Sequence, residues 1–411
     1  MIEKKLSNGL KIYFDINRDY KYSCIMMFFG VGWRDDDTKK MGIAHLFEHL
    51  VGKRTHKHKN KGEIHSVKNS YGIKFNAVTT PNSTSYHHSQ LHEVTPMSLN
   101  LLLESIYDSY FDLQDLASEK DVVKRESENY FDNKYNFLWD SITKKLFPNT
   151  NLSNCMFGTE ETLDSITLKD FDNFYKGYLN PKNANLLLGI KDERQMEELI
   201  NIIEEFYKKC DKLTTIEFVK NKIEIQKKSI MSKDINISKD GKTQADVAIV
   251  FEHDKLSSGQ LVALDILVNI LVGNWSSLIF NRLRDELALV YGMWIHSFKS
   301  PDLSYSYIYF SVSKDKANQA ISEVKSIIGQ AKNNIDQKML VASKNKFILD
   351  TVSDYNLVKI LYGYRDSIIN GNNIITFEDK INLAEKIELK DILDLIDFIF
   401  NKKECHIVTV Q

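Results

Sequence analysis

Proline, glycine and cysteine are all scarce in this sequence. It has 5 prolines and 17 glycines among 411 residues, which excludes collagen-like, low-complexity and wholly disordered chains. Its 4 cysteines are scattered, and because none stands in a C-x-x-C pair, we expect neither a zinc ribbon nor a thioredoxin-like site. Reduced thiols in a cytoplasmic protein are the expectation.

An excess of either charge is also lacking. The 54 Lys and Arg residues are balanced by 56 Asp and Glu residues, so the net charge of −2 gives no long-range field for a nucleic acid or an anionic membrane. Residues 1–10 contain no apolar core of a secretory signal. The most apolar helical stretch, 264–272, is far shorter than the roughly 20 residues of a membrane span. We expect no nucleic-acid partner and no membrane partner.

A chain of 411 residues is long enough for two domains of roughly 100–200 residues each. In the first half, alternating and continuous apolar runs predict strands, and apolar residues at helical spacing predict helices. We expect strands over 10–15, 23–31, 75–79, 83–88 and 184–190, and helices over 41–51, 99–111 and 192–209. A long helix should begin near Ser118, because Ser118 and Asp121 have the spacing of a capping box.

The pattern of the first half returns in the second half. Residues 245–253 resemble 24–32, and residues 266–273 align with 45–52; both pairs of segments are 221 positions apart. The apolar packing positions match, whereas His45, Glu48 and His49 of the first copy are replaced by Ile, Asn and Ile. A diverged duplication is the simplest explanation.

Each copy mixes strands and helices without strict alternation, which favours an α+β fold with two homologous domains. Residues 213–243 are rich in Lys and Ile and have no clear helical face, so they indicate an extended linker that can contain edge strands of its own. We therefore predict a first domain over 1–212, a linker over 213–243 and a second domain over 244–411. The first domain carries the chemistry, and the second keeps the packing.

The polar residues of the first copy form the motif His45-x-x-Glu48-His49. Residues four apart on a helix share one face, so the two imidazoles can hold one tetrahedral zinc ion. Glu48 lies beside that face, where a carboxylate can take a proton from a water that zinc acidifies. A single histidine on an apolar face is most often a core residue, but two imidazoles and a carboxylate on one turn are costly to bury without a partner.

The segment 42–55, which contains this motif, resembles the inverzincins. These are the pitrilysin- and insulinase-type zinc peptidases, peptidase family M16, which include the mitochondrial processing peptidases. The family has a further acidic zinc ligand in a helix with the pattern E-x6-E, and Glu119 and Glu126 have that spacing here. The resemblance implies one zinc ion per chain, held by His45, His49 and Glu126, with Glu119 as a supporting carboxylate.

A second segment is similar to the substrate-binding hairpin of the family. Residues 75–79 read F-N-A-V-T, and a T-x-Y follows at 84–86. The resemblance implies that Phe75, Asn76 and Ala77 lie on an edge strand beside the zinc, to which the substrate backbone adds by β-augmentation.

A third segment lies in the second half. Residues 277–291 resemble the family phrase S-x-L-F-x-x-L-R-E-x-x-G-L-A-Y. The resemblance implies that Arg284 and Tyr291 bind the substrate carbonyl and its developing oxyanion from the wall opposite the zinc.

Four residues depart from the family pattern. Trp33 replaces a small residue, Arg54 and Ala288 each stand where a glycine is usual, and Trp275 lies in a normally glycine-rich turn. None of them removes a ligand, but they change the shape of the pocket and hence its preference.

Two other groups of basic residues are not expected to form functional sites. The basic segment 53–61, KRTHKHKNK, is interpreted as a solvated loop rather than a nucleic-acid site or a second metal site. His87 and His88 are neighbours on an expected strand, so their side chains should point to opposite faces and cannot chelate together.

The resemblance implies a zinc metalloendopeptidase of the short, two-domain form, similar to bacterial processing-peptidase-like proteins. It should cleave unfolded peptides or flexible leader segments, with Glu48 as the base. One alternative is a catalytically silent or partner-dependent family member that serves as a chamber subunit or scaffold in a heterodimer. Another is a zinc-binding regulator without hydrolysis. The intact motif together with Glu126 favours the enzyme.

The number of domains bears on the partner. Long members of the family have four such domains in one chain, which form two bowls around a chamber. This chain has two, so the resemblance implies a dimer. We expect a homodimer in which Arg284 and Tyr291 of one subunit serve the zinc of its partner, and a heterodimer with a homologue is the alternative.

Overall fold

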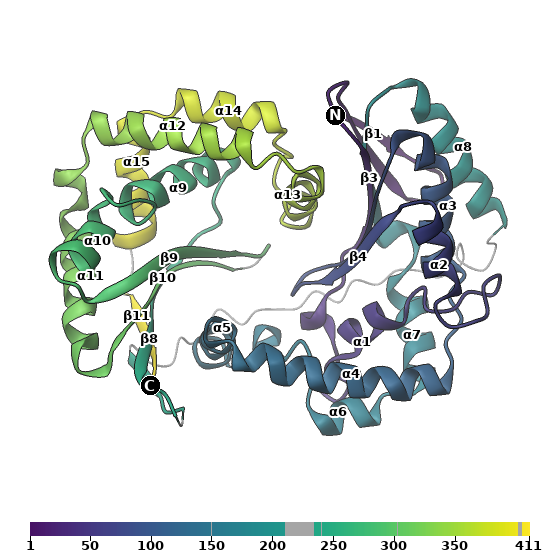
Figure 1. Ribbon diagram of the computed structural model, residues 1–411, viewed down its shortest axis with the longest axis horizontal. Helices are drawn as coiled ribbons and strands as arrows, with labels where there is room; N and C mark the ends of the chain where they lie inside the picture. The colour runs from purple at the N-terminus through teal and green to yellow at the C-terminus, as the bar shows by residue number, and fades with distance from the viewer. Residues whose placement is uncertain (149, 210–233, 240, 302, 402–404) are drawn as a thin grey trace. The chain divides into compact units, whose positions relative to one another are not determined.

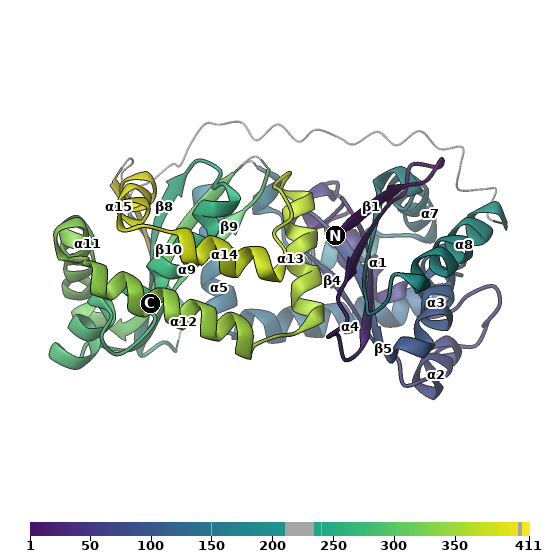
Figure 2. The same ribbon diagram turned by 90° about the horizontal axis from the view of Figure 1, so that it is seen from above.

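The computed structural model of the protein describes residues 1–148, 150–209, 234–239, 241–301, 303–401 and 405–411. These residues form two compact units, each with one β-sheet and its covering helices (Figures 1 and 2). The α+β fold class with two homologous domains is thus confirmed.

A six-stranded sheet forms the centre of the first unit (Figure 1). In spatial order its strands are β1 (Ile2–Lys5), β2 (Lys11–Ile16), β6 (Ala184–Ile190), β3 (Ser23–Phe29), β5 (Thr84–Gln90) and β4 (Lys74–Thr79). Strands β2 and β6 are parallel and all other pairs are antiparallel. All side chains of β3 are buried, as its continuous apolar sequence predicts, and β4 lies at one edge of the sheet.

Helices cover both faces of this sheet. The helices of the first half that belong to this unit are α1 (Ile43–Leu50), α2 (Glu63–Ser70), α3 (Thr95–Tyr107), α4 (Leu113–Asp132), α6 (Glu160–Ser165), α7 (Leu168–Tyr178) and α8 (Arg194–Lys209). On β5, His88 contacts Ser98 of α3, with 3.1 Å between Nδ1 and Oγ, while His87 contacts Tyr362 of α13 (Leu357–Ile369), with 3.0 Å between Nδ1 and the hydroxyl. The two histidines therefore point to opposite faces, as predicted.

The sheet of the second unit has five strands. In spatial order they are β7 (Asp234–Ile237), β11 (His406–Val410), β8 (Gln244–His253), β10 (Ser304–Ser313) and β9 (Val290–Lys299). This order repeats β2-β6-β3-β5-β4 of the first sheet, and the parallel pair, β7 with β11, stands at the same place. The shared order supports the duplication, and β7 is an edge strand within the predicted linker. The rest of that linker up to residue 233 lies outside the described residues.

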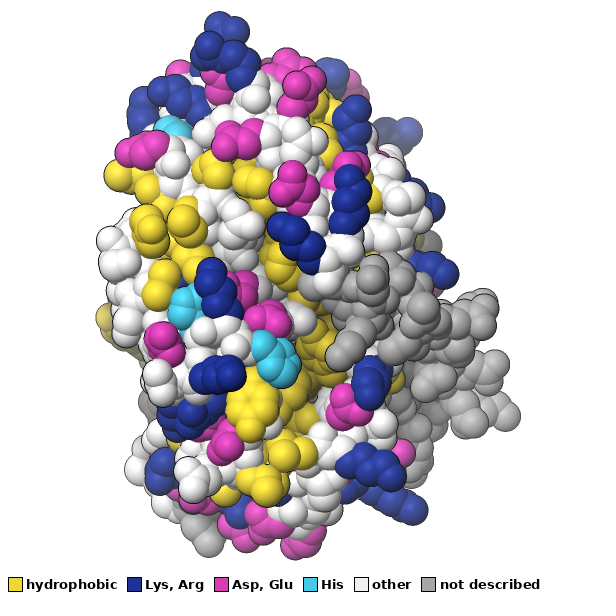
Figure 3. Space-filling view, turned by 90° about the vertical axis from the view of Figure 1, so that its right-hand side faces the viewer, with side chains coloured by type: hydrophobic (Ala, Val, Ile, Leu, Met, Phe, Trp, Pro, Cys, Tyr) yellow, Lys and Arg dark blue, Asp and Glu magenta, His cyan; other side chains and the backbone are white. Residues whose placement is uncertain are grey.

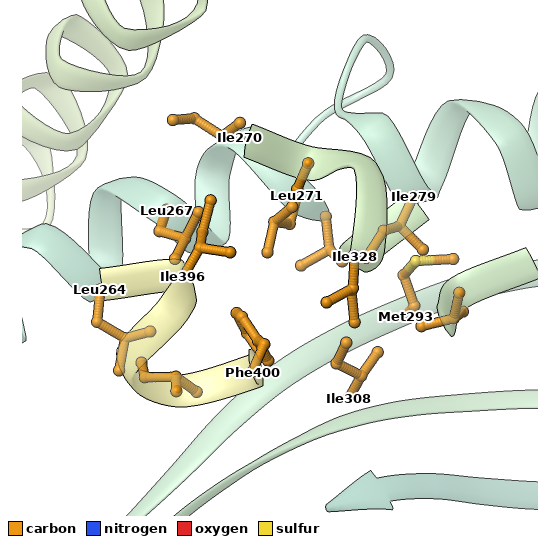
Figure 4. Close-up of a cluster of buried hydrophobic side chains, with 14 of the residues drawn as sticks. Leu264, Leu267, Ile270, Leu271, Ile279, Met293, Ile308, Ile328, Ile396 and Phe400 are labelled. Atoms are coloured by element: carbon orange, nitrogen blue, oxygen red, sulfur yellow. The ribbon is translucent and has the colours of Figure 1, made fainter. Parts of the chain in front are cut away.

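One face of the second sheet packs on a large hydrophobic core. The helices of this unit are α5 (Lys134–Leu146), α9 (Ser258–Leu271), α10 (Leu278–Phe280), α11 (Ala317–Asn334), α12 (Gln337–Ser353), α14 (Phe377–Lys386) and α15 (Leu389–Ile396). Figure 4 shows Leu267 and Leu271 of α9 above Ile308 of β10, with Ile396 and Phe400 beside them. Of the three positions that align with the first copy's metal motif, Ile266 and Ile270 are part of this apolar core.

Aromatic residues line the other face of the second sheet. The hydroxyl groups of Tyr135 of α5 and Tyr307 of β10 are 2.6 Å apart. Trp294 of β9 stacks on Tyr309, the residue opposite it in the register, at 5.3 Å between ring centroids. Such directly opposed rings stabilise neighbouring strands.

The compact units are not identical with the two halves of the sequence. Residues 131–148, which include α5, belong to the second unit, and residues 356–365, which include most of α13, belong to the first. In the first unit, Leu357 packs closely on Gly189 of β6, where an added Cβ would lie 2.7 Å from Leu357 Cδ1. The hydroxyl of Tyr364 donates a hydrogen bond of 2.8 Å to Asp15 of β2. Each half of the sequence thus supplies one helix to the other unit.

The predicted start of the long helix at Ser118 was wrong. Helix α4 begins at Leu113, because Asp112 accepts hydrogen bonds from the amides of Gln114 at 2.8 Å and Asp115 at 3.4 Å and so acts as its cap. Ser118 lies inside the helix, and its hydroxyl donates to the carbonyl of Asp115 instead.

Charges of both signs are interspersed with hydrophobic side chains on the side of the first unit that carries α2, α3 and α8 (Figure 3). This mixture agrees with the near-neutral composition. Within the described parts of the chain, every helix is too short or too polar to pass through a bilayer.

A buried lysine stands out in the first unit. Lys68 of α2 is 4% exposed, and its Nζ lies 4.8 Å from the centre of the Phe75 ring. Burial lowers the pKa of its ammonium group to about 8, although the charge of Glu104 opposes this shift. Since the unfolded chain keeps the ordinary lysine pKa, the unfolded state binds more protons between pH 8 and 10.5, and stability must rise with pH across that window.

We expect Lys68→Met to remove this pH dependence. Below pH 8 the variant should be more stable than the parent chain by on the order of 2–3 kcal/mol at most, because the buried charge is gone. The difference should shrink as the pH rises to 10.5. Urea denaturation of both chains at several pH values measures it, with Lys74→Met, a change at an exposed lysine, as the matched control. Parallel stability curves for the parent chain and Lys68→Met would contradict the assignment.

Candidate metal centre

Helix α1 carries the H-x-x-E-H motif and is fixed at its first turn. It follows Gly42, whose φ of 92° lies in the left-handed region that favours glycine. A Cβ there would lie 2.6 Å from the carbonyl oxygen of Phe157, so no side chain fits. The carboxylate of Asp36 accepts hydrogen bonds from the amides of Gly42 at 2.8 Å and Ala44 at 3.3 Å, and so satisfies N–H groups that a helix start leaves open.

The apolar face of α1 anchors it in the first unit. Leu46, Phe47 and Leu50 are buried, and the Phe47 ring stacks on that of Phe171 at 5.6 Å. Because these residues take one side of the helix, His45, Glu48 and His49 share the other.

The structure brings together three of the sequence-predicted residues as one group of possible metal ligands. Nitrogen atoms of His45 and His49 and a carboxylate oxygen of Glu126 all lie within 4.8 Å of one another. Glu126 Oε2 is 3.4 Å from His45 Nε2 and 3.2 Å from His49 Nε2. The contact joins α1 to α4, which are more than 60 residues apart in sequence.

These distances fit a zinc ion. Donor atoms that lie about 2.0–2.2 Å from a tetrahedral zinc are roughly 3.3 Å from each other, close to the two separations between imidazole nitrogen and carboxylate oxygen. Two imidazoles and one carboxylate are also the donor types of catalytic zinc sites, which keep a fourth position for water or substrate. His45, His49 and Glu126 could therefore hold zinc between them.

Glu119 contacts His49 on the side of the imidazole that faces away from Glu126. It lies two turns before Glu126 on α4, is 4% exposed, and its Oε2 is 3.4 Å from His49 Nδ1. When Nδ1 carries the proton and donates it to Glu119, the lone pair of Nε2 is free to bind a metal ion shared with Glu126. The Nδ1 of His45 is buried 3.7 Å from Glu48 Oε2, and among the described residues it has no hydrogen-bond partner.

The carboxylates raise the pKa of both imidazoles. Burial would lower the pKa of His49, but hydrogen bonds to Glu119 and Glu126 outweigh it and raise it to about 9. The pKa of His45 is also raised, against burial, by its hydrogen bond to Glu126 and by the negative charge of Glu48. In turn, hydrogen bonds from His45 and His49 hold the pKa of Glu126 far below its usual range. The negative charge that attracts protons here also favours a divalent cation.

Glu48 is held at the end of the predicted substrate strand. Its Oε2 accepts a hydrogen bond from the hydroxyl of Thr79, the last residue of β4. Phe75, Asn76 and Ala77 precede Thr79 on the same strand, which pairs with β5 and forms an edge of the sheet. The structure thus places the predicted base and the predicted substrate strand side by side.

The basic segment 53–61 was expected to be a solvated loop, and its Lys57, Lys59 and Lys61 are exposed, but the expectation was wrong for Lys53 and Arg54, which are half-buried. Lys53 forms an ion pair with Glu119, and Arg54 forms one with Asp115 of α4. Burial would raise the pKa of Glu119, but hydrogen bonds from His49 and Lys53 lower it to about 2. The loop neutralises carboxylates that come from a distant part of the sequence.

Arg284 and Tyr291 lie in the second unit. The guanidinium of Arg284, on the π-helical turn Asn281–Glu286, lies 4.3 Å from the ring centre of Trp275 and 4.8 Å from that of Tyr291. It also donates a hydrogen bond of 2.8 Å to the carbonyl of Tyr291, whose side chain is 85% exposed. Ala288, where the family usually has glycine, has a positive φ of 50°, which explains that glycine preference.

Sequence reasoning did not find the supporting residues of the site. Thr79 is part of the hairpin motif at 75–79, but the motif alone did not indicate that its hydroxyl binds Glu48. Asp36 lies six residues before Gly42, too far for a local capping pattern. Lys53 and Arg54 read as part of a charge run, because their partners on α4 are remote in sequence.

Comparison with known proteins agrees with this arrangement. Residues 15–160 match the model of the insulinase family, peptidase family M16, and residues 165–347 match the model described as the peptidase M16 inactive domain. Together the two matches cover most of the chain, which therefore belongs to peptidase family M16. The second match covers the end of the first unit and much of the copy that lacks the H-x-x-E-H motif.

Relatives with assigned names fall in the same class. An uncharacterized zinc protease of Rickettsia felis is 24% identical over 97% of this chain and 94% of its own length. The zinc protease YmxG of Bacillus subtilis is 25% identical over 93% and 95%. The beta subunit of the mitochondrial-processing peptidase of Saccharomyces cerevisiae is 26% identical over 49% of this chain and 43% of its own.

Solved structures show the same fold. A protease from Helicobacter pylori superimposes with a TM-score of 0.87 at 20% identity, covering 100% of this chain and 99% of its own. A peptidase M16 inactive domain from Pseudomonas fluorescens gives a TM-score of 0.87 at 16% identity, covering 100% and 97%. The chain thus belongs to a family of zinc proteases.

We expect the purified chain to bind about one zinc ion, and the double variant His45→Ala, His49→Ala to bind less than about a tenth of that, because one carboxylate alone is a poor zinc site. Elemental analysis after exhaustive dialysis measures the ratio of zinc to protein. His87→Ala, at a histidine that faces Tyr362, is the control and should keep its zinc. A double variant that retains stoichiometric zinc would rule out this ligand set.

Proposed function

We propose that the protein is a zinc-dependent endopeptidase whose zinc is held by His45, His49 and Glu126 and whose base is Glu48. The observation that carries this proposal is the convergence of two imidazoles and the Glu126 carboxylate on one point, with Glu48 on the same helix. A zinc ion bound there would act as a Lewis acid, which polarises the scissile carbonyl and acidifies water.

The residues of the chain supply the proton transfers. Glu48 takes a proton from the attacking water, and the same carboxyl group then gives it to the leaving amine. Its hydrogen bond to Thr79 engages Oε2 and so fixes the orientation of the carboxylate. Glu119 keeps the proton of His49 on Nδ1, so that Nε2 stays available as a ligand.

The edge strand β4 supports a particular kind of substrate. A peptide that adds to β4 through backbone hydrogen bonds must present a free, extended segment. Folded proteins seldom offer one, so unfolded peptides and flexible leader segments are the proposed substrates. Contacts with Phe75, Asn76 and Ala77 would place such a segment next to Glu48, because Thr79 of the same strand binds that residue.

Glu48→Gln should abolish hydrolysis while zinc stays bound. The amide keeps the shape of the side chain but cannot accept the proton, so we expect turnover of a quenched fluorescent peptide to fall by roughly 10²–10⁴-fold. Zinc content is measured on the same sample and should equal that of the parent chain. Near-normal turnover in this variant would exclude Glu48 as the base and leave the metal site itself untouched.

We propose further that the working form is a dimer. The chain has two family domains, the long members have four, and one named relative is described as a subunit of a processing peptidase. By resemblance, Arg284 and Tyr291 of one subunit would bind the substrate carbonyl at the zinc site of its partner. The ring contacts that hold the Arg284 guanidinium would keep it oriented for that task. A homodimer then has two complete sites.

Mixing two inactive variants tests this sharing. One variant is Glu48→Gln, and the other combines Arg284→Ala with Tyr291→Phe. If sites are shared, hybrid dimers contain one site with an intact zinc half and an intact Arg and Tyr half, and about a quarter of the activity should return after statistical subunit exchange of an equimolar mixture. Peptide hydrolysis is measured before and after mixing, and exchange is followed with labelled chains. Complete exchange without recovery would mean that the site is built within one chain.

A further inference from the structure

Two carboxylates of α4 are buried one turn apart. Asp115 and Glu119 are 3% and 4% exposed and lie on the face of the helix that also buries Leu116 and Val123. A buried carboxylate is strongly unfavourable unless cations and hydrogen-bond donors compensate it. The structure must therefore supply partners for both.

Besides His49, which contacts Glu119, three cations of the basic segment 53–61 compensate them. Arg54 donates from Nε to Asp115 Oδ2 at 2.5 Å and from Nη2 to Oδ1 at 3.4 Å, a two-point contact that fixes geometry as well as charge. Lys53 pairs with Glu119 Oε1. Lys61 lies 3.5 Å from Asp115 and 4.0 Å from Glu119. We call Lys53, Arg54 and Lys61 the basic clasp.

The clasp is itself anchored at both ends. The amide of Gly62 donates to the carbonyl of Lys53 at 3.2 Å, which closes the loop. Arg54 Nη1 donates to the carbonyl of Lys59 at 2.9 Å, and the amide of Tyr110 donates to the carbonyl of Arg54 at 3.0 Å. The loop follows α1 directly, so it ties the end of the motif helix to the first turns of α4.

Glu119 connects the clasp to the metal group. Its Oε1 is taken by Lys53, and its Oε2 lies 3.4 Å from His49 Nδ1. With one oxygen held by the lysine, the other is fixed in the direction of the imidazole. The lysine thus determines where Glu119 points, and Glu119 determines which nitrogen of His49 faces Glu126.

The position of Glu126 depends on the same contacts. It lies seven residues after Glu119, two turns along α4, and an α-helix advances about 1.5 Å and turns about 100° per residue. A slip of α4 by a single residue would move the Glu126 carboxylate away from both imidazoles. The clasp grips α4 at Asp115 and Glu119, and so sets its register against α1.

We propose that Lys53 and Arg54 are positioning residues of the zinc site, which hold α4 in register with α1 through the buried carboxylates of Asp115 and Glu119. The proposal rests on the proposed zinc ligation by His45, His49 and Glu126. It assigns a role to Arg54, the residue that replaces the usual glycine of the family.

Zinc affinity of the full-length chain tests the proposal without recourse to activity. Competition with a chromogenic chelator should show that Lys53→Met and Arg54→Met each bind zinc about 10–100-fold more weakly than the parent chain. The visible spectrum of the Co²⁺-loaded protein should change in both, because it reports the coordination geometry. Lys53→Arg should restore affinity to within about threefold, since it keeps a cation in reach of Glu119.

The matched control is Lys57→Met. Lys57 belongs to the same loop and carries the same charge, but its side chain is 71% exposed and its ion pair, at 3.7 Å, is with Glu104 rather than with α4. This variant should bind zinc and Co²⁺ as the parent chain does. Equal weakening in Lys57→Met would indicate a general charge effect and would overturn the positioning role.

A second variant separates positioning from stability. Arg54→Met leaves Asp115 buried without its arginine, so the chain loses stability for that reason alone. Adding Asp115→Asn should restore the unfolding midpoint, yet zinc should remain about 10-fold weaker because the two-point contact is still missing. Affinity that returns together with stability would overturn the role of Arg54.

The outcomes also separate this proposal from the proposed function. A parent chain that binds zinc, with Lys53→Met binding it equally tightly and giving the same Co²⁺ spectrum, overturns the positioning role and leaves the endopeptidase proposal intact. A parent chain that binds no zinc overturns both.

Discussion

The contact of His49 with the carboxylates of Glu119 and Glu126 is the constraint around which the first unit is organised. It joins two helices that are far apart in sequence, and it brings together charges that would be costly to bury singly. Several features serve it: Asp36 fixes the start of α1, the apolar side of α1 fixes its rotation, and Leu116 and Val123 bury one side of α4. Thr79 then brings the edge strand to Glu48.

The sequence predicted those parts of the fold and site that depend on local patterns. The periodicity of β3 and α1, the spacing of His45 and His49, and the seven-residue spacing of Glu119 and Glu126 are all readable along the chain. Contacts between remote segments were not readable. In the sequence, Lys53 and Arg54 look solvated because Asp115 and Glu119 stand about 60 positions away. Ser118 has the spacing of a cap, but Asp112 is the residue that caps the helix.

The two units show what a duplicated fold can keep and what it can lose. Both sheets have the same order of five strands and the same parallel pair, although the second copy has apolar residues where the first has metal ligands. Apolar packing therefore suffices to fix the strand order, and the fold forms with or without the metal motif on the helix. The second copy contains the π-helical turn Asn281–Glu286, on which Arg284 lies among aromatic rings.

The exchange of helices between the two halves has a consequence for how the chain can be divided. Helix α5 is encoded in the first half but packs in the second unit, and most of α13 is encoded in the second half but packs in the first. A cut in the region between the two halves would give fragments that each lack a piece of their own core and expose a helix meant for the other. Such fragments should fold poorly alone and should complement each other when mixed. Neither half of the sequence can therefore serve as an independent domain in another protein.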